Sequence, residues 1–283
     1  MKKVLLLWFQ LLLLLPFHVA AQSGQDLRAE LQKLAWQTGP TNGTITARAG
    51  IKVPQGFVFL DSQNTSRFLE LNGNPPRPDH YMIAPENLSW FAVFSFEEQG
   101  YVKDDEKLDP DALLKSLKES DADGNDERKK LGMQAIFTDG WQVPPHYDTE
   151  SKRLEWGTRL RTADGALVVN YTSRLLGRKG IMSAVLVSSL DTLGPDSTAF
   201  KALLGGFDYV TGERYSEFKQ GDRVAEFGLA ALVLGGAAAV ATKKGFWAAI
   251  VAFLGAFWKV LIGFAVAGLA GIGSLFKKKK SGP

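Results

Sequence analysis

The chain has 283 residues, of which 45% are hydrophobic and 22% charged, a composition typical of a globular protein. It contains no cysteine, which excludes disulfides, cysteine nucleophiles, cysteine-ligated zinc and iron–sulfur clusters. The formal net charge is +3, but nine of the 33 basic residues lie in two hydrophobic terminal regions. The span 22–242 contains the other 24 basic residues and all 30 acidic residues, so its net charge is −6. We therefore expect no nucleic-acid partner.

Residues 1–21 have the three parts of a secretory signal peptide. Lys2 and Lys3 supply positive charge, an apolar stretch follows over 4–15, and small residues precede a cleavage that we expect after Ala21. An uncleaved signal anchor is the alternative, but the apolar stretch is short for a membrane span of about 20 residues. We expect the domain that follows to be exported.

The region 223–276 is expected to anchor the chain in a membrane. It contains two hydrophobic segments, about 227–242 and 246–276, and a basic tail follows over 277–283. Lysines beside a membrane span favour the cytoplasmic side, so we expect the basic tail there. Because the preceding domain is expected to be exported, a cytoplasmic tail requires an odd number of crossings. The lengths of the two segments fit two crossings better, and the number of crossings stays open.

Small residues recur at helical spacing along the second segment, a pattern that lets membrane helices approach one another closely. They are Ala248, Ala252, Ala256, Gly263, Ala267 and Gly271. Lys259 lies on the same face, and a hairpin of the two segments would place it at the depth of Glu226. One hypothesis is therefore a charge pair between Glu226 and Lys259. The alternative is that the lysine side chain extends to the lipid headgroups.

The exported part divides into a short helix and linker over 22–42 and a domain over 43–222. Apolar residues at helical spacing predict helices over 26–36, from 61 or 62 to 71, from Pro110 with an interruption at the acidic run 121–126, and over 191–204. Alternating or aromatic runs predict strands over 44–49, 90–96, 153–161, 166–176 and 180–189. Strands mostly follow one another directly. The expected fold class is therefore α+β, a mainly antiparallel sheet with packed helices, followed by a C-terminal helical membrane anchor.

Metal and cofactor motifs are not evident. The acidic run 121–126 lacks the glycine and glutamate positions of a calcium loop. His146 and Asp148 offer two metal ligands, but no third ligand follows at a suitable spacing. The sequence contains no nucleophile elbow, phosphate-binding loop or zinc-protease motif. We therefore expect neither a metal nor a cofactor.

Two sets of residues remain as candidate binding sites. The first combines aromatic and polar groups beside two prolines, as binding loops do: Trp141, His146, Tyr147 and Asp148. The second places three cations near one turn, where they would suit a carboxylate or phosphate group: Arg174, Arg178 and Lys179. The alternative for each set is a purely structural turn.

Strings rich in glycine, proline and aromatic residues are spread along the chain. Three of them are Gly140-Trp-x-x-Pro-Pro-His-Tyr-Asp148, Arg174-x-Leu-Gly-Arg-x-Gly180 and Val53-Pro-x-Gly-Phe-x-Phe-Leu-Asp61. Together these strings resemble a family of bacterial membrane-anchored proteins that share a domain of unknown function. The resemblance covers nearly all of the chain after the signal peptide. It implies a Gram-negative-type cell envelope and no particular activity.

The combined expectation is a membrane-anchored cell-envelope protein that binds a partner. We expect it in the inner membrane of a Gram-negative-type bacterium, with its main domain outside the cytoplasm. Its partner would be a membrane or envelope protein, or a second copy bound through the anchor. The alternative is an envelope hydrolase that uses carboxylates and His146.

Overall fold

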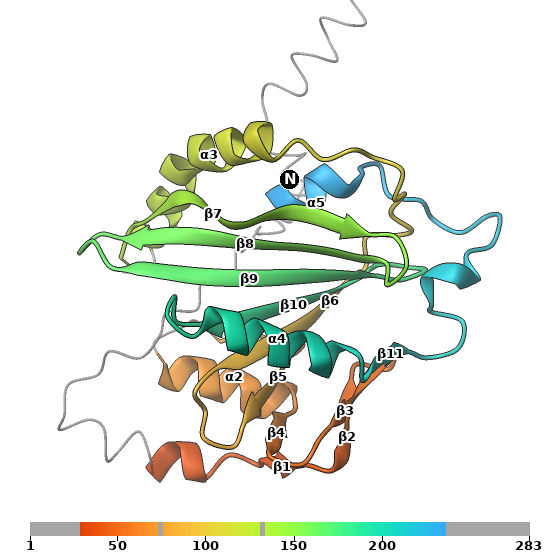
Figure 1. The fold of residues 1–283 in the computed structure, drawn as a ribbon. Coiled ribbons are helices and arrows are strands. Elements are labelled where there is room, and N and C mark those ends of the chain that lie inside the picture. Colours follow the sequence, from red (N-terminus) through yellow and green to blue (C-terminus); the bar gives the residue numbers. More distant parts are fainter. Residues whose placement is uncertain (1–28, 73–75, 131–133, 236–283) are drawn as a thin grey trace, which may run out of the picture. The chain divides into compact units, whose positions relative to one another are not determined.

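The computed structural model describes residues 29–72, 76–130 and 134–235 (Figure 1). All of these residues belong to one compact unit, Met1–Ala237. The expected signal peptide, the second anchor segment and the basic tail lie outside the described residues.

An eight-stranded sheet forms the framework of this unit, with the strand order β1-β4-β5-β6-β10-β9-β8-β7. Its strands are β1 (Gln37–Thr38), β4 (Phe57–Leu60), β5 (His80–Pro85), β6 (Phe91–Glu97), β7 (Ile136–Asp148), β8 (Arg153–Thr162), β9 (Leu167–Leu176) and β10 (Ile181–Ser188). A three-stranded sheet, in the order β11-β3-β2, contains β2 (Thr41–Ile45), β3 (Ala49–Val53) and β11 (Phe207–Tyr209). Neighbouring strands are antiparallel throughout both sheets, which confirms the expected α+β class.

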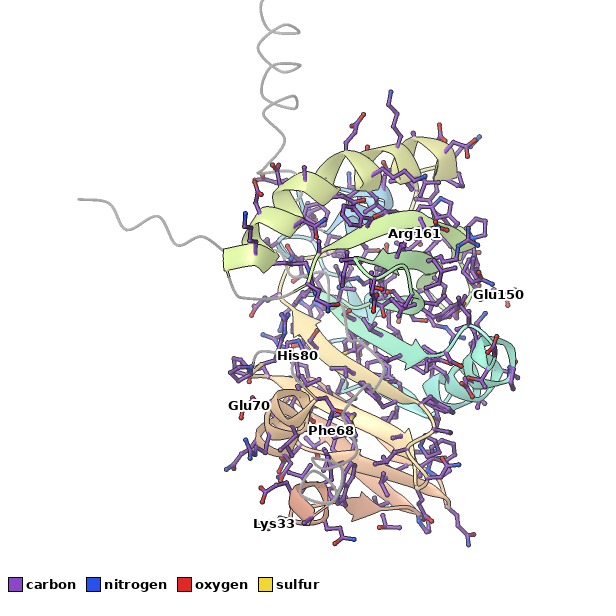
Figure 2. The ribbon with its side chains drawn as sticks, turned by 90° about the vertical axis from the view of Figure 1, so that its left-hand side faces the viewer. Lys33, Phe68, Glu70, His80, Glu150 and Arg161 are labelled. Atoms are coloured by element: carbon purple, nitrogen blue, oxygen red, sulfur yellow. The ribbon has the colours of Figure 1, made fainter. Side chains whose placement is uncertain are left out.

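The helices pack on both faces of the large sheet. They are α2 (Ser62–Leu71), α3 (Pro110–Lys130), α4 (Leu193–Leu204) and α5 (Leu229–Leu234), with a short 3-10 helix, η1 (Tyr215–Glu217). One face, here called the α4 face, buries α4 and the small sheet against β6, β9 and β10. The other, here called the α3 face, buries α2 against one end and α3 with α5 against the other. Figure 2 shows α2 and α4 on opposite sides of the sheet.

The two central strands β9 and β10 are buried on both faces, and β9 buries polar as well as apolar side chains. Tyr171 and Leu175 of β9 pack on the α4 face, whereas Leu176 of β9 and Ile181 of β10 pack on the α3 face. The sequence-based predictions of β8, β9 and β10 are confirmed to within two residues. The predicted start of α2 is also confirmed, because the Asp61 side chain caps the helix by accepting from the Asn64 amide.

Three predictions of local structure are wrong. The proline-rich stretch up to Asp148 is not a turn but the end of β7, an edge strand in which prolines are tolerated because its outer N–H groups need no ladder partner. The run 121–126 does not interrupt a helix, because α3 continues through it. The predicted strand 44–49 is a hairpin of β2 and β3, which turns where Thr46 adopts a positive φ of 57°.

Side chains of α3 explain why the helix persists through a sequence of weak helix formers. Asn125 exchanges two hydrogen bonds of 2.8 Å with the backbone of Ile136. Asp121 accepts from the amide and hydroxyl of Thr138, at 2.7 and 2.8 Å. These side chains supply hydrogen-bond partners to backbone groups at the outer edge of β7. The polar residues that were expected to interrupt the helix therefore hold it against the sheet.

The first predicted anchor segment, 227–242, is described only as far as Gly235. Its beginning forms α5, and Leu229, Leu232 and Val233 are buried in the same cluster as Trp156. Glu226 is exposed, whereas its hypothetical partner Lys259 and the small-residue face lie outside the described residues. Within the ranges that the structure describes, no helix is both long and apolar enough to cross a membrane.

Removing the amide of Asn125 is predicted to weaken the domain. In Asn125→Ala the backbone N–H and C=O of Ile136 lose their partner, which we expect to cost about 1–3 kcal/mol of unfolding free energy. Urea denaturation measures this loss, and amide hydrogen exchange at Ile136 should accelerate with it. The matched control is Asp123→Ala at an exposed position of the same helix, and an equal loss in both variants would contradict the role of Asn125.

Candidate functional site

The residues of the first candidate set lie on β7, and the alternation of the strand sends them to opposite faces. Trp141 and Tyr147 pack on the α3 face. The Trp141 indole donates to the carbonyl of Pro110 at 2.9 Å, and the Tyr147 hydroxyl donates to Asp104 at 2.8 Å. Both aromatic side chains therefore fasten the start of α3 and the preceding loop to the sheet.

Asp104 is the centre of the contacts around Tyr147. It also accepts from the Lys152 ammonium at 2.8 Å. Burial raises the pKa of Asp104, but the hydrogen bonds from Lys152 and Tyr147 outweigh burial and hold that pKa below its usual value. Burial and the neighbouring Asp104 carboxylate raise the pKa of Tyr147, so its hydroxyl stays a neutral donor. Asp104 therefore connects the loop before α3 to β7, through Tyr147, and to the turn between β7 and β8, through Lys152.

His146 and Asp148 lie on the α4 face. Asp148 holds the turn between β7 and β8, accepting from the Glu150 amide at 2.9 Å and the Ser151 hydroxyl at 2.8 Å. The hydrogen bond from Ser151 is the main reason that the pKa of Asp148 is lowered. The half-exposed His146 has its Nε2 3.5 Å from a carboxylate oxygen of Glu155.

Glu155 is a buried carboxylate that sequence reasoning missed. It accepts from the hydroxyls of Ser173 at 2.9 Å and Tyr171 at 3.1 Å, and its Oε2 lies 3.2 Å from the Lys201 ammonium of α4. Burial raises the pKa of Glu155. The hydrogen bond from Ser173 and the charge of Lys201 lower that pKa by more than burial raises it, so the net shift is downward. No local signal marks Glu155, because only the pairing of β8 with β9 places it opposite Ser173.

The three cations of the second candidate set do not converge on one site. Arg174 points to the α3 face and pairs with Glu97, whereas Arg178 and Lys179 lie in the turn between β9 and β10. Arg178 binds Asp222 through two hydrogen bonds of 2.7 Å, and Lys179 lies 2.7 Å from Glu213. The hydrogen bonds from Arg178 lower the pKa of Asp222 to about 2. These cations therefore bind carboxylates of their own chain and fasten the segment before α5.

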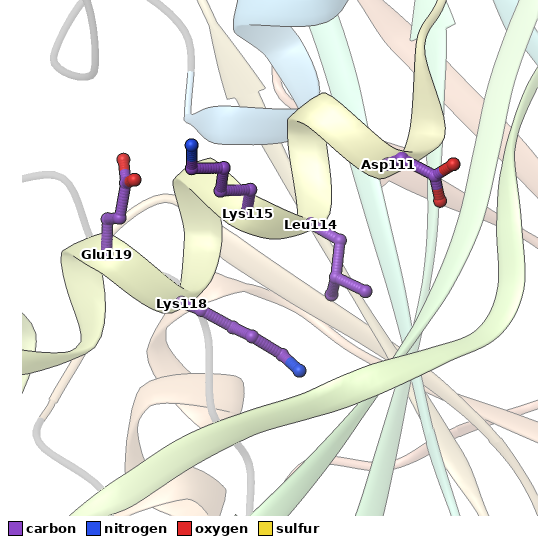
Figure 3. Close-up of a pocket in the computed structure, with 5 residues that line it drawn as sticks. All are labelled: Asp111, Leu114, Lys115, Lys118 and Glu119. Carbon is purple, nitrogen blue, oxygen red and sulfur yellow. The ribbon is translucent and has the colours of Figure 1, made fainter.

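The described residues contain no group of three histidine, aspartate or glutamate side chains placed to hold a metal. One surface hollow lies along α3 (Figure 3), lined by Asp111, Leu114, Lys115, Lys118 and Glu119. All of its lining side chains come from one helix, and they carry two positive and two negative charges. The hollow is therefore part of an ordinary solvated helix surface.

The α4 face has an uncovered region at the far end of the sheet. In Figure 1, α4 crosses in front of β10 and leaves β7 and β8 open on this side. We call this region the open strip and define it by the side chains that it presents: Phe137, Asp139, Arg159, Arg161, Leu167 and Lys201.

One row of the open strip combines apolar groups with a cation. Phe137, Arg161 and Leu167 are direct cross-strand neighbours on β7, β8 and β9. Phe137 is 47% exposed and Leu167 39%, and both are among the exposed large hydrophobic residues of the described chain. Asp139 pairs with both Arg159 and Arg161, and their hydrogen bonds lower its pKa. This row therefore combines exposed apolar side chains with a cation, a chemistry suited to contact with another molecule.

Replacing Glu155 is predicted to make stability less sensitive to acid. At pH 7, Glu155→Gln should lose about 1–3 kcal/mol of unfolding free energy, because three donors lose a charged acceptor. The folded-state pKa of Glu155 lies below its usual value of about 4.3, so its contribution is present above that value. The contribution disappears as the pH falls through the folded-state pKa.

The measurement is urea denaturation of the wild type and Glu155→Gln between pH 7 and pH 3. The exposed Glu150→Gln is the control, since Glu150 lies in the neighbouring turn. A difference between wild type and Glu155→Gln that stays constant down to pH 3 would contradict the assignment.

No curated protein sequence matches this chain. The solution structure of cyanobacterial PsbP (CyanoP) from Synechocystis sp. PCC 6803 is similar, with a TM-score of 0.36 and 11% identity, covering 60% of this chain and 91% of that chain. That similarity carries no conclusion about function. A family model described as "Protein of unknown function (DUF2167)" matches residues 37–268, and the chain therefore belongs to this family.

Proposed function

We propose that this protein is a membrane-anchored cell-envelope protein whose α+β domain binds a protein partner and catalyses no reaction. The observation that supports partner binding is the open strip, where two exposed apolar side chains flank a cation on an uncovered sheet face. Exposed apolar groups beside arginine are typical of protein interfaces.

The proposed location rests on the sequence. A signal-like N-terminus, a hydrophobic region after α5 and a final run of lysines support attachment to the inner membrane of a Gram-negative-type bacterium. In this proposal the α+β domain lies outside the cytoplasm, and the anchor assembles with other membrane helices or with a second copy.

The hydrolase alternative has weaker support. A general acid needs a carboxyl group whose pKa is raised toward neutrality. Glu155, the carboxylate nearest to His146, has a lowered pKa and is surrounded by donors from its own chain. Asp148, the carboxylate two residues after His146, holds a turn. We therefore do not propose hydrolysis.

Site-specific photocrosslinking in the living source bacterium tests the proposal. A benzophenone amino acid in place of Phe137 should give a discrete crosslinked protein, because this side chain is exposed on the open strip. Val210, which is 45% exposed in the turn after β11, is the control position and should give none. No adduct at Phe137 or Leu167, or the same adducts at Val210, would contradict partner binding.

A second arm of this experiment separates binding from catalysis. Complementation of a deletion strain by His146→Ala is expected to be complete, since the polar contacts of the His146 ring among the described residues are with Glu155 and the carbonyl of Pro144. Loss of complementation by His146→Ala and by Asp148→Asn, with the fold intact by circular dichroism, would favour the hydrolase.

A further inference from the structure

We infer that the open strip binds an amphipathic helix of its partner, one that carries a carboxylate between two apolar residues spaced seven positions apart. This inference rests on the proposed partner binding and names the chemistry of the partner. It is carried by the order of the side chains in the row Phe137, Arg161 and Leu167.

The spacing of the row indicates a helix. Neighbouring strands lie about 4.8 Å apart, so Phe137 and Leu167, two strands apart, are separated by roughly 10 Å. An α-helix rises about 1.5 Å per residue, so side chains at positions i and i+7 lie on one face about 10.5 Å apart. Residues i+3 and i+4 lie between them on that face and would meet Arg161. An extended peptide fits less well, since its side chains on one side recur about every 6.8 Å.

The charge of the strip favours a carboxylate on the partner. The strip presents three cations, Arg159, Arg161 and Lys201, and one carboxylate, Asp139, while the buried carboxylate of Glu155 lies beside Lys201. The strip is therefore positive, whereas the span 22–242 as a whole has a net charge of −6. An acidic partner would be attracted to the strip and repelled by the remaining surface of the domain.

Donor groups also remain for a second carboxylate. Arg159 reaches Asp139 through Nε and Arg161 reaches it through Nη2, so the two guanidinium groups share one carboxylate. A guanidinium group has five N–H donors, which leaves donors on both arginines for a partner's carboxylate. About half of the Arg161 side chain is exposed, so its remaining donors are accessible.

Two other paired arginines of the sheet region, Arg178 and Arg174, differ from Arg161 in their surroundings. The Arg178 guanidinium is almost buried and forks onto the equally buried Asp222. Arg174 is buried in the sheet and pairs with Glu97. Neither side chain lies beside an exposed apolar residue in a cross-strand row, as Arg161 does.

The test uses the full chain in nanodiscs and a fluorescein-labelled, alanine-based peptide of about 18 residues. The peptide has leucine at i and i+7 with glutamate at i+3 and i+4. A second peptide has lysine in place of the glutamates. Fluorescence anisotropy measures the affinity. We expect the glutamate peptide to bind at least about tenfold more tightly than the lysine peptide.

Variants of the chain locate the binding. Arg161→Glu and Phe137→Ser should each weaken binding of the glutamate peptide at least about tenfold. The matched control is Arg67→Glu on α2, on the opposite face, because Arg67 is equally exposed and also pairs with glutamates. Urea denaturation verifies that each variant is folded, and Leu167→Ser replaces Phe137→Ser if the latter is not.

Equal affinity for the two peptides, or equal weakening by Arg161→Glu and Arg67→Glu, would overturn the inference. These outcomes are distinct from a failure of the proposed function. If a partner crosslinks at Phe137 while the glutamate peptide shows no preference, partner binding stands and the acidic helix is wrong. If no partner crosslinks at Phe137 or Leu167, the proposed function itself fails.

Discussion

The antiparallel register that joins β8, β9 and β10 decides which side chains meet in the rest of the domain. It places Glu155 opposite Ser173 and Arg161 opposite Leu167, so one row becomes a buried hydrogen-bonded group and another an exposed mixed surface. A shift of one residue would exchange the two faces of a strand. Because β9 and β10 are buried on both faces, such a shift would move Arg174 into the apolar layer under α4.

The outer edge of the sheet is closed by polar side chains rather than by another strand. Asp121 and Asn125 bind the backbone of β7 at its beginning, and two prolines remove N–H donors near its end. An unprotected edge of thirteen residues would invite pairing with other chains. With this edge occupied, the face of β7 and β8 is the part of the outer sheet that remains accessible to a partner.

The ion pairs of the domain fall into two kinds with different consequences. At the turn between β9 and β10, Arg178 and Lys179 each bind a carboxylate of the segment that leads to α5, so these pairs position the start of the hydrophobic C-terminal region. On the open strip, Asp139 is shared by two arginines, and donors remain. The Arg178 side chain is largely buried in its pair, whereas the Arg161 side chain stays about half exposed, and this difference separates a structural turn from a candidate interface.

Local patterns in the sequence determined the α+β class, the strands β8 to β10 and the start of α2, because periodicity and capping act over a few residues. The signal-like N-terminus, the hydrophobic C-terminal region and the acidic balance of 22–242 are likewise read from the sequence alone. Only the tertiary structure decided that Pro144 and Pro145 belong to an edge strand, that Trp141 and His146 face opposite sides, and that Glu155 meets Lys201. Each of these depends on strand order or on pairing between distant segments, and a local pattern carries no information about either.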